Sequence, residues 1–206
     1  MPADFDAALS NVSRETSDRL AAYAALVRKW NPAINLVSRN SLDTLEDRHI
    51  RDSAQIFTLA PQSARHWVDL GSGGGFPGLV VAVMAAEFSP EMKVTLVESD
   101  MRKAAFLATV ARELGLSAIV IPDRIEKVPA AGADVLSARA LAPLSALLGF
   151  ADRHLAAGGV ALFPKGATHA AEIAEARAIW SFDVETLASV TDPAAAVLRV
   201  RGISRV

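Results

Sequence analysis

The sequence predicts an α/β protein whose doubly wound, mostly parallel sheet of seven strands follows an N-terminal helical extension. Up to about residue 65, apolar residues recur at helical spacing. Beyond that point, short apolar runs of strand length alternate with helical segments, and the last two such runs follow one another directly. We therefore expect one domain over 1–206, with the extension over 1–65 and a Rossmann-like core over 66–206.

The extension is expected to contain two helices. One apolar face at helical spacing defines the first helix: Leu20, Tyr23, Ala24, Val27 and Trp30. Ser13 or Ser17 can cap its start, and Asn31-Pro32 is expected to end it because proline lacks an N–H and restricts the preceding residue. The second helix is expected over 41–59, before Pro61. Trp30 has the spacing of a core residue.

The core is expected to alternate strands with helices. The predicted strands are 67–70, 94–97, 118–121, 134–137, 160–163, 182–190 and 196–200. The predicted helices are 77–87, 101–114, 143–156 and 169–180. Pro77 suits a first helical turn, and Gly158-Gly159 is expected to stop the third of these helices. The consecutive final strands indicate an antiparallel edge.

Composition limits the function classes. The 206 residues carry a net charge of −2, which argues against a polycationic nucleic-acid binder but leaves a local RNA-binding patch open. There is no cysteine, so disulfides and thiolate metal sites are excluded, and we expect no metal. Residues 1–13 lack the apolar stretch of a signal peptide, and the apolar run 79–86 is too short to span a bilayer. We expect a soluble cytoplasmic protein, and nothing in the sequence demands more than a monomer.

A glycine-rich segment, DLGSGGGFPG at 69–78, follows the first predicted strand and opens a helix. Glycine allows backbone angles that a Cβ opposes and lets a ligand approach the main chain. Residues 73–78 also match G-x-G-x-x-G, so a nicotinamide-dependent reductase could share this loop.

Two acids favour S-adenosylmethionine over a dinucleotide. Asp69 lies at the strand end, where it can bind a methionine ammonium group directly or through water. Glu98 ends the second strand, 27 residues after Gly71, and can accept both ribose hydroxyls. The predicted fold is therefore that of a class I S-adenosylmethionine-dependent methyltransferase.

With these motifs the sequence resembles a known family, the bacterial 16S rRNA (guanine-N7) methyltransferases, RsmG (GidB). The resemblance covers nearly the whole chain. The matching segments besides the glycine loop are Lys29-Trp30-Asn31-Pro32, Ile34-Asn35-Leu36-Val37, His49-Ile50-Arg51-Asp52-Ser53, Arg102-Lys103 before Phe106-Leu107, Ser137-Ala138-Arg139-Ala140 and Phe163-Pro164-Lys165-Gly166. The segments in the extension make the match specific, because the glycine loop alone indicates only a methyltransferase.

The resemblance implies N7 methylation of one guanine in 16S rRNA, on the RNA or on a small-subunit particle, in the cytoplasm. It also implies cofactor contacts at Gly71, Phe76, Ile125, Glu126 and Arg139. The glycine loop itself adds Ser72 and Gly73 to the expected cofactor-binding residues. We expect the extension to help recognise RNA.

Methylation at guanine N7 requires no general base. The N7 lone pair attacks a sulfonium methyl group without prior deprotonation, so positioning replaces a general base. Pyrimidine C5 methylation usually needs a Cys nucleophile, which this chain lacks. Methylation of exocyclic amines often uses an Asn/Asp-Pro-Pro-aromatic motif, which residues 137–143 lack.

Three residues are expected to position the substrate: Arg139, Lys165 and His49. Arg139, at the end of the fourth strand, can read guanine, hold a phosphate, contact the cofactor carboxylate or form a surface ion pair. Lys165 follows the fifth strand and can bind RNA phosphate or the target base, or remain solvated. His49, Arg51 and Asp52 can form a lid over the crevice, although Asp52 could equally cap a helix or pair with Arg51.

Three other functions stay open on the sequence. One is a methyltransferase acting on a small molecule or a protein. Another is a non-catalytic RNA module that binds S-adenosylmethionine, and the third is the nicotinamide-dependent reductase.

Overall fold

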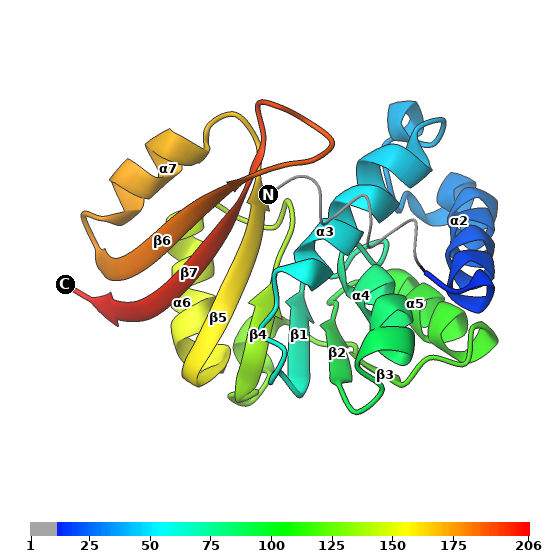
Figure 1. Cartoon of the computed structure of the whole chain (residues 1–206), viewed down its shortest axis with the longest axis horizontal. Helices are drawn as coiled ribbons and strands as arrows, with labels where there is room; N and C mark the ends of the chain where they lie inside the picture. The colour runs from blue at the N-terminus through cyan, green and yellow to red at the C-terminus, as the bar shows by residue number, and fades with distance from the viewer. Residues whose placement is uncertain (1–11) are drawn as a thin grey trace.

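The computed structural model describes residues 12–206 and contains one seven-stranded sheet in the order β3-β2-β1-β4-β5-β7-β6 (Figure 1). The strands are β1 (His66–Leu70), β2 (Lys93–Val97), β3 (Ala118–Ile121), β4 (Ala133–Ser137), β5 (Leu155–Lys165), β6 (Trp180–Ala188) and β7 (Ala196–Arg205). The first five strands pair in parallel, and β7 pairs antiparallel with both β5 and β6. The expected doubly wound, mostly parallel sheet with an antiparallel edge is confirmed.

Helices cover both faces of the sheet (Figure 1). The α-helices are α2 (Arg14–Ile34), α3 (Asp52–Thr58), α4 (Gly78–Phe88), α5 (Met101–Glu113), α6 (Leu144–His154) and α7 (His169–Ala176). Three short helices complete the set: η1 (Arg39–Ser41), the π-helix η2 (Glu46–Arg51) and η3 (Ile125–Lys127). Helix α2 packs on α4 and α5, α3 packs on α4, and α6 packs with α7 on the other side. Among residues 12–206, no helix is long and apolar enough to cross a membrane.

The two faces of the sheet bury separate apolar clusters. Alternation along β1 sends Trp67 to the cluster under α2, α3, α4 and α5, and Val68 and Leu70 to the cluster under α6. Both faces are therefore apolar, which explains why these strands read as continuous apolar runs. Trp30, expected in the core, packs against this first cluster with its ring centroid 5.7 Å from that of Phe106.

The expected end of the first helix at Asn31-Pro32 is wrong, because α2 continues through Pro32 to Ile34. Proline removes one backbone donor, but the Asn31 side chain supports the chain beyond it. Its Oδ1 accepts from the N–H groups of Leu36 (2.7 Å) and Val37 (2.8 Å). The helix ends at Asn35, which has a φ of 49° and donates its N–H to the Asn31 carbonyl.

The start of α2 is capped by Ser13, whose Oγ accepts from the Thr16 N–H at 3.2 Å. Of the two candidate caps, Ser13 is confirmed. Residues 1–11, where the extension begins and where we expect no signal peptide, lie outside the described residues. The division of the chain near residue 65 stays a prediction.

Three other expected helices differ from the structure. The segment expected as one helix over 41–59 is divided into η1, η2 and α3. The helix expected over 143–156 ends at His154, because β5 begins at Leu155 and pairs with Ala133 of β4, so Gly158 and Gly159 lie inside a strand. The helix expected to reach Trp180 ends at Ala176, since Trp180 is buried as the first residue of β6. Sheet pairing overrides local helical spacing at both places.

Candidate functional site

The glycine loop connects β1 to α4 and has three residues with positive φ: Gly71 at 64°, Gly73 at 55° and Gly75 at 96°. A Cβ on Gly75 would lie 2.5 Å from Leu79 Cδ1 and 2.7 Å from Tyr23 Oη. Gly75 is therefore required by both its backbone angle and its packing. At Gly73 the nearest atom to a Cβ would be the Gly71 carbonyl oxygen at 3.8 Å, so the main chain there faces open space.

Asp69 lies beneath this loop with no exposed surface. Its Oδ1 accepts from Ser137 Oγ at 2.6 Å, and its Oδ2 accepts from the Gly78 N–H at 3.3 Å. Ser137 Oγ in turn accepts from Trp67 Nε1 at 2.8 Å. Burial raises the pKa of Asp69 to about 6, while the hydrogen bonds from Ser137, Ser72 and Gly78 oppose this increase.

This placement changes the expected role of Asp69. Its carboxylate does not line the cleft described below, and both oxygens already bind protein donors. Asp69 therefore supports the loop and the first turn of α4 from below. Its contact with a methionine ammonium group stays a prediction.

Glu98, just past the end of β2, holds the loop from the other side. Its Oε2 accepts from the Gly73 N–H at 2.7 Å, and its Oε1 accepts from the Asp100 N–H at 2.8 Å. The side chain is buried but lines the cleft. Each carboxylate oxygen has a further lone pair, so Glu98 can still accept hydroxyl donors from a ligand.

These elements enclose a cleft of about 540 Å³, here called the glycine-loop cleft. Its walls come from the loop, the end of β2, η3 and residues 139–142. The expected cofactor residues that line it are Gly71, Ser72, Gly73, Phe76, Glu98, Ile125, Glu126 and Arg139. The volume is that of a small-molecule site, and the open main chain with a carboxylate at its edge fits an adenosine-type cofactor.

A second cavity of about 560 Å³ adjoins this cleft, and the two share Arg139 and Ala140 in their walls. It is lined by residues from η2, α3, the end of β5 and the connection between β6 and β7. The three expected substrate-positioning residues, His49, Arg139 and Lys165, all line it. The topology therefore brings them to one place, although they come from distant parts of the sequence.

Arg139 lies between the two cavities. Its Cζ is 5.2 Å from the ring centroid of Phe76, and its Nη1 is 3.7 Å from Asp52 Oδ2. Burial lowers the pKa of the guanidinium, and the Asp52 charge opposes that shift. The ion pair is mostly buried, so the alternative of a surface ion pair does not apply. Asp52 begins α3 and pairs with Arg139 across the cavity wall.

His49 packs its ring on Phe76, with 5.0 Å between the centroids. Neither ring nitrogen has a hydrogen-bond partner among the described residues. Burial and, to a smaller extent, the charges of Arg139 and Arg48 together lower the pKa of His49 to about 4. The imidazole is therefore neutral at pH 7.

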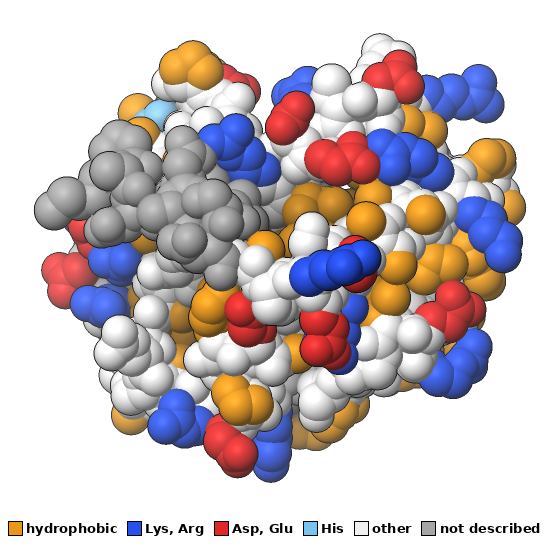
Figure 2. Space-filling model, turned by 45° about the vertical axis from the view of Figure 1, so that its right-hand side comes forward, with side chains coloured by type: hydrophobic (Ala, Val, Ile, Leu, Met, Phe, Trp, Pro, Cys, Tyr) orange, Lys and Arg blue, Asp and Glu red, His pale blue; other side chains and the backbone are white. Residues whose placement is uncertain are grey.

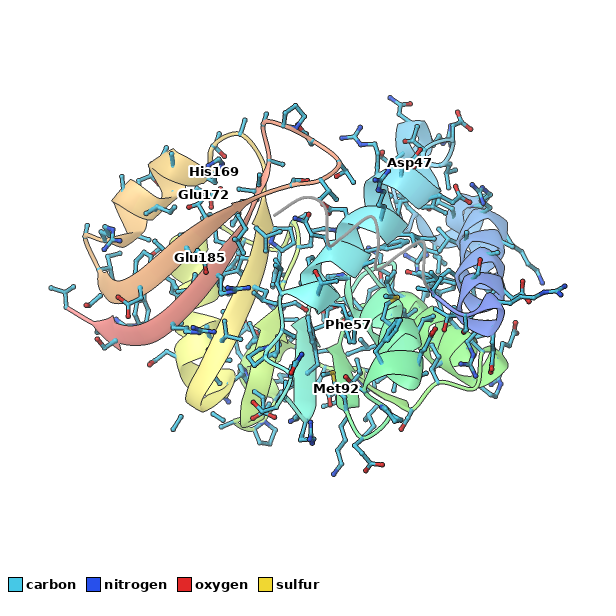
Figure 3. All side chains as sticks on the ribbon, viewed as in Figure 1. Asp47, Phe57, Met92, His169, Glu172 and Glu185 are labelled. Atoms are coloured by element: carbon cyan, nitrogen blue, oxygen red, sulfur yellow. The ribbon has the colours of Figure 1, made fainter. Side chains whose placement is uncertain are left out.

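Lys165 is not a solvated lysine. Its Nζ donates to Glu172 Oε2 at 2.7 Å and to the Ala142 carbonyl at 2.8 Å, and only 10% of its side chain is exposed. Glu172, labelled on α7 in Figure 3, also accepts from the Leu144 N–H at the start of α6. The pair joins β5, α6 and α7 at the wall of the second cavity.

Several residues at this site carry little or no signal in the sequence. Glu172 carried only the weak signal of an acid in a first helical turn. Tyr23, expected only as a core residue, donates from its hydroxyl to the Gly74 carbonyl at 2.6 Å and so links α2 to the loop. Ser189 and Thr191 lie beside Asp52, more than 130 residues away in the chain. No linear pattern predicts such contacts.

Acidic and basic side chains are interspersed over the face drawn in Figure 2, where the coloured residues form no extended patch of one sign. Among residues 12–206, no group of three or more His, Asp or Glu side chains could hold a metal ion. Neither the charges on this face nor metal ligands among the described residues therefore identify a further site.

Comparisons with known proteins identify relatives of this chain. The GidB family model, rRNA small subunit methyltransferase G, matches residues 16–197. The ribosomal RNA small subunit methyltransferase G of Ruegeria sp. (strain TM1040) is 54% identical over 196 residues, which is 95% of each chain.

Solved structures share the fold at low identity. Cofactor-bound Rv0187 from MTB superposes with a TM-score of 0.62 at 15% identity and covers 97% of both chains. The ribosomal protein L11 methylase from Lactobacillus delbrueckii subsp. bulgaricus has a TM-score of 0.59 at 17% identity, covering 77% of this chain and 78% of that one. The chain is therefore similar in fold to these proteins.

Proposed function

The chain belongs to the GidB family, rRNA small subunit methyltransferase G, and from that premise we propose that it transfers a methyl group from S-adenosylmethionine to N7 of one guanine in 16S rRNA. The family assigns a methyltransferase of small-subunit rRNA. The cofactor, the atom methylated and the site residues belong to the proposal.

The observation that carries it is the pair of cavities that meet at Arg139 and Ala140. A methyl transfer needs a donor and an acceptor on either side of one boundary, with the reacting atoms in line. The glycine-loop cleft suits the donor, and the second cavity suits a base presented by RNA. Bound S-adenosylmethionine would supply an electrophilic methyl group on a sulfonium.

Different residues of the glycine-loop cleft are proposed to bind different parts of that cofactor. Glu98 would accept hydrogen bonds from the ribose hydroxyls, and Gly71, Ser72 and Gly73, which line the cleft, would hold the ligand against their main chain. Ile125 and Glu126 of η3 contribute another part of the cleft wall. Phe76 and Arg139 close the end that adjoins the second cavity.

The acceptor side positions the base and removes no proton. Guanine N7 presents a free lone pair, so no residue has to act as a general base. His49 is neutral and fixed on Phe76, Arg139 carries its charge to the boundary, and Lys165 is held by Glu172. Rigid groups of this kind accelerate a reaction by orientation and by preorganised electrostatics.

We also propose that the substrate is 16S rRNA or a small-subunit particle in the cytoplasm and that the extension helps recognise the RNA. Helices α2 and α3, with Tyr23 on the glycine loop and Asp52 on Arg139, place the extension beside both cavities. RNA bound there would lie next to the methyl donor.

The test is a map of 7-methylguanine in 16S rRNA, taken after incubation with the protein and S-adenosylmethionine. One position should become methylated, and no position should respond when the cofactor is omitted. Binding of S-adenosylhomocysteine without methylation would instead indicate the non-catalytic RNA module. Calorimetry that shows tighter binding of NAD would favour the reductase.

A further inference from the structure

Asp52 is an incompletely paired carboxylate in the wall of the second cavity. Its Oδ1 lies 3.4 Å from Ser189 Oγ and 3.3 Å from Thr191 Oγ1, and its Oδ2 lies 3.7 Å from Arg139 Nη1. Good charge-assisted hydrogen bonds are about 2.7–2.9 Å long. Only 15% of the side chain is exposed, so water does not compensate fully for these long contacts.

The other carboxylates nearby differ from Asp52. Glu172 accepts from Lys165 at 2.7 Å, and Asp192 accepts from the Ala194 N–H at 2.9 Å. In the glycine-loop cleft, Glu98 has bonds of 2.7 and 2.8 Å. Among the described carboxylates that line the second cavity, Asp52 is thus the one whose polar contacts are all longer than 3.2 Å.

His49 stands three residues before Asp52, where the π-helix η2 continues into α3. Both line the second cavity, and both ring nitrogens of His49 lack a partner among the described residues. A neutral imidazole offers one donor and one acceptor, and a carboxylate offers only acceptors. The two acceptor oxygens of Asp52 complement the two neighbouring donors on the Watson–Crick edge of guanine, N1–H and the N2 amine.

We propose that Asp52 reads the Watson–Crick edge of the target guanine, accepting hydrogen bonds from N1–H and the N2 amine, while N7 points to the boundary with the glycine-loop cleft. The proposal rests on the methyl transfer proposed above and identifies the pocket for the base. Adenine is rejected there because its N1 is an acceptor and its C2 carries no amine, which leaves the carboxylate facing a lone pair.

The same contact favours the reaction. Methylation places a positive charge on the purine, so N1–H becomes a stronger donor as the new bond to N7 forms. A hydrogen bond from N1–H to a carboxylate therefore strengthens between the ground state and the transition state, which is the condition for acceleration. No proton has to leave N1 for this to happen.

Inosine isolates the N2 amine, because it retains N7, O6 and N1–H. We would measure single-turnover methylation, at saturating S-adenosylmethionine, of a 16S rRNA substrate with guanine or inosine at the mapped position. The wild-type protein should favour guanine by about 10-fold or more, as expected for one charge-assisted hydrogen bond. In Asp52→Asn the rate on guanine should fall by about 10- to 100-fold and the guanine-to-inosine ratio should approach one.

Asp47→Asn is the matched control, since Asp47 is an exposed acid on η2 (Figure 3) and does not line the second cavity. The Asp47→Asn variant should keep the wild-type guanine-to-inosine ratio of methylation rates. Affinity for S-adenosylhomocysteine, measured on each variant, should be the same in Asp52→Asn as in the wild type.

Two results would overturn the proposal. One is a wild-type guanine-to-inosine ratio that persists in Asp52→Asn. The other is an equal loss of rate on both RNAs together with weaker S-adenosylhomocysteine binding, which would make Asp52 a support for Arg139. A wild-type protein that methylates neither RNA contradicts the proposed function itself, and that failure is distinguishable from both.

Discussion

The two cavities on either side of Arg139 differ in how tightly their polar side chains are held by hydrogen bonds. In the glycine-loop cleft, Glu98 accepts from the N–H groups of Gly73 and Asp100 at 2.7 and 2.8 Å, and beneath the loop Asp69 accepts from Ser137 Oγ at 2.6 Å. The second cavity draws on segments far apart in the chain, its half-buried Asp52 has polar contacts of 3.3–3.7 Å, and neither ring nitrogen of the half-buried His49 has a hydrogen-bond partner among the described residues. The difference teaches that the first region is preorganised by its own bonds, whereas the second has polar groups available for a substrate.

The largest expected effect is a loss of stability on substitution of the tightly packed Gly75 in the glycine loop. Gly75→Ala should lower the free energy of unfolding by about 2–4 kcal/mol, because the residue must keep a φ of 96° while its Cβ meets buried Leu79 and the bound Tyr23 hydroxyl. Urea denaturation followed by circular dichroism measures this change.

Gly132→Ala is the control for the backbone angle alone. Its φ is 62°, but no atom lies within 4 Å of the added Cβ, so the cost should be only about 1–2 kcal/mol. Equal losses in the two variants would show that packing around Gly75 contributes nothing.

The second prediction compares how Asp69, beneath the glycine loop, and His49, at the second cavity, change the stability of the protein with pH. The pKa of Asp69 is raised from 3.8 to about 6 in the folded protein, so the folded state binds more protons than the unfolded state between these values. Its contribution favours folding at acid pH and is lost as pH rises through about 6. The unfolding free energy of the wild type minus that of Asp69→Asn should therefore fall by up to about 3 kcal/mol between about pH 4 and pH 7.

His49 should show the opposite slope. Its pKa is lowered from 6.5 to about 4, so its contribution is present above pH 6.5 and is lost as pH falls through about 4. The corresponding difference between the wild type and His49→Gln should increase with pH over this range. Slopes of the same sign in the two variants would contradict the distinction between the two regions.

The smallest of the three effects concerns ligand binding. Glu98→Ala should weaken binding of S-adenosylhomocysteine by about 1–3 kcal/mol, because it removes an acceptor for the ligand and the anchor of Gly73. Isothermal titration calorimetry measures the affinity. Glu91→Ala, which removes an exposed acid just before β2, should bind like the wild type. Unchanged affinity in Glu98→Ala would exclude Glu98 as a ribose ligand.

Much of the fold is predictable because the strands are short, apolar and bounded by clear turn residues. The expected strand 118–121 coincides with β3, and those at 67–70 and 94–97 differ from β1 and β2 by one residue. The errors in element boundaries arise where a side-chain hydrogen bond or a strand pairing overrides the local sequence signal. Pro32 does not end α2 because the Asn31 side chain supports the following residues, and Gly158-Gly159 lies within β5 because β4 pairs with the segment.

By itself the sequence determined the fold class, the glycine loop, its position before α4 and the acid at Glu98, because these depend on neighbouring residues and on strand order. Only the tertiary structure decided which side chains meet. It moved Asp69 beneath the loop, paired Lys165 with Glu172 and brought Asp52 to Arg139, Ser189 and Thr191. The physical reason is that burial and partner distance set the charge and the free hydrogen-bonding capacity of a side chain, and both arise only when segments far apart in the chain pack together.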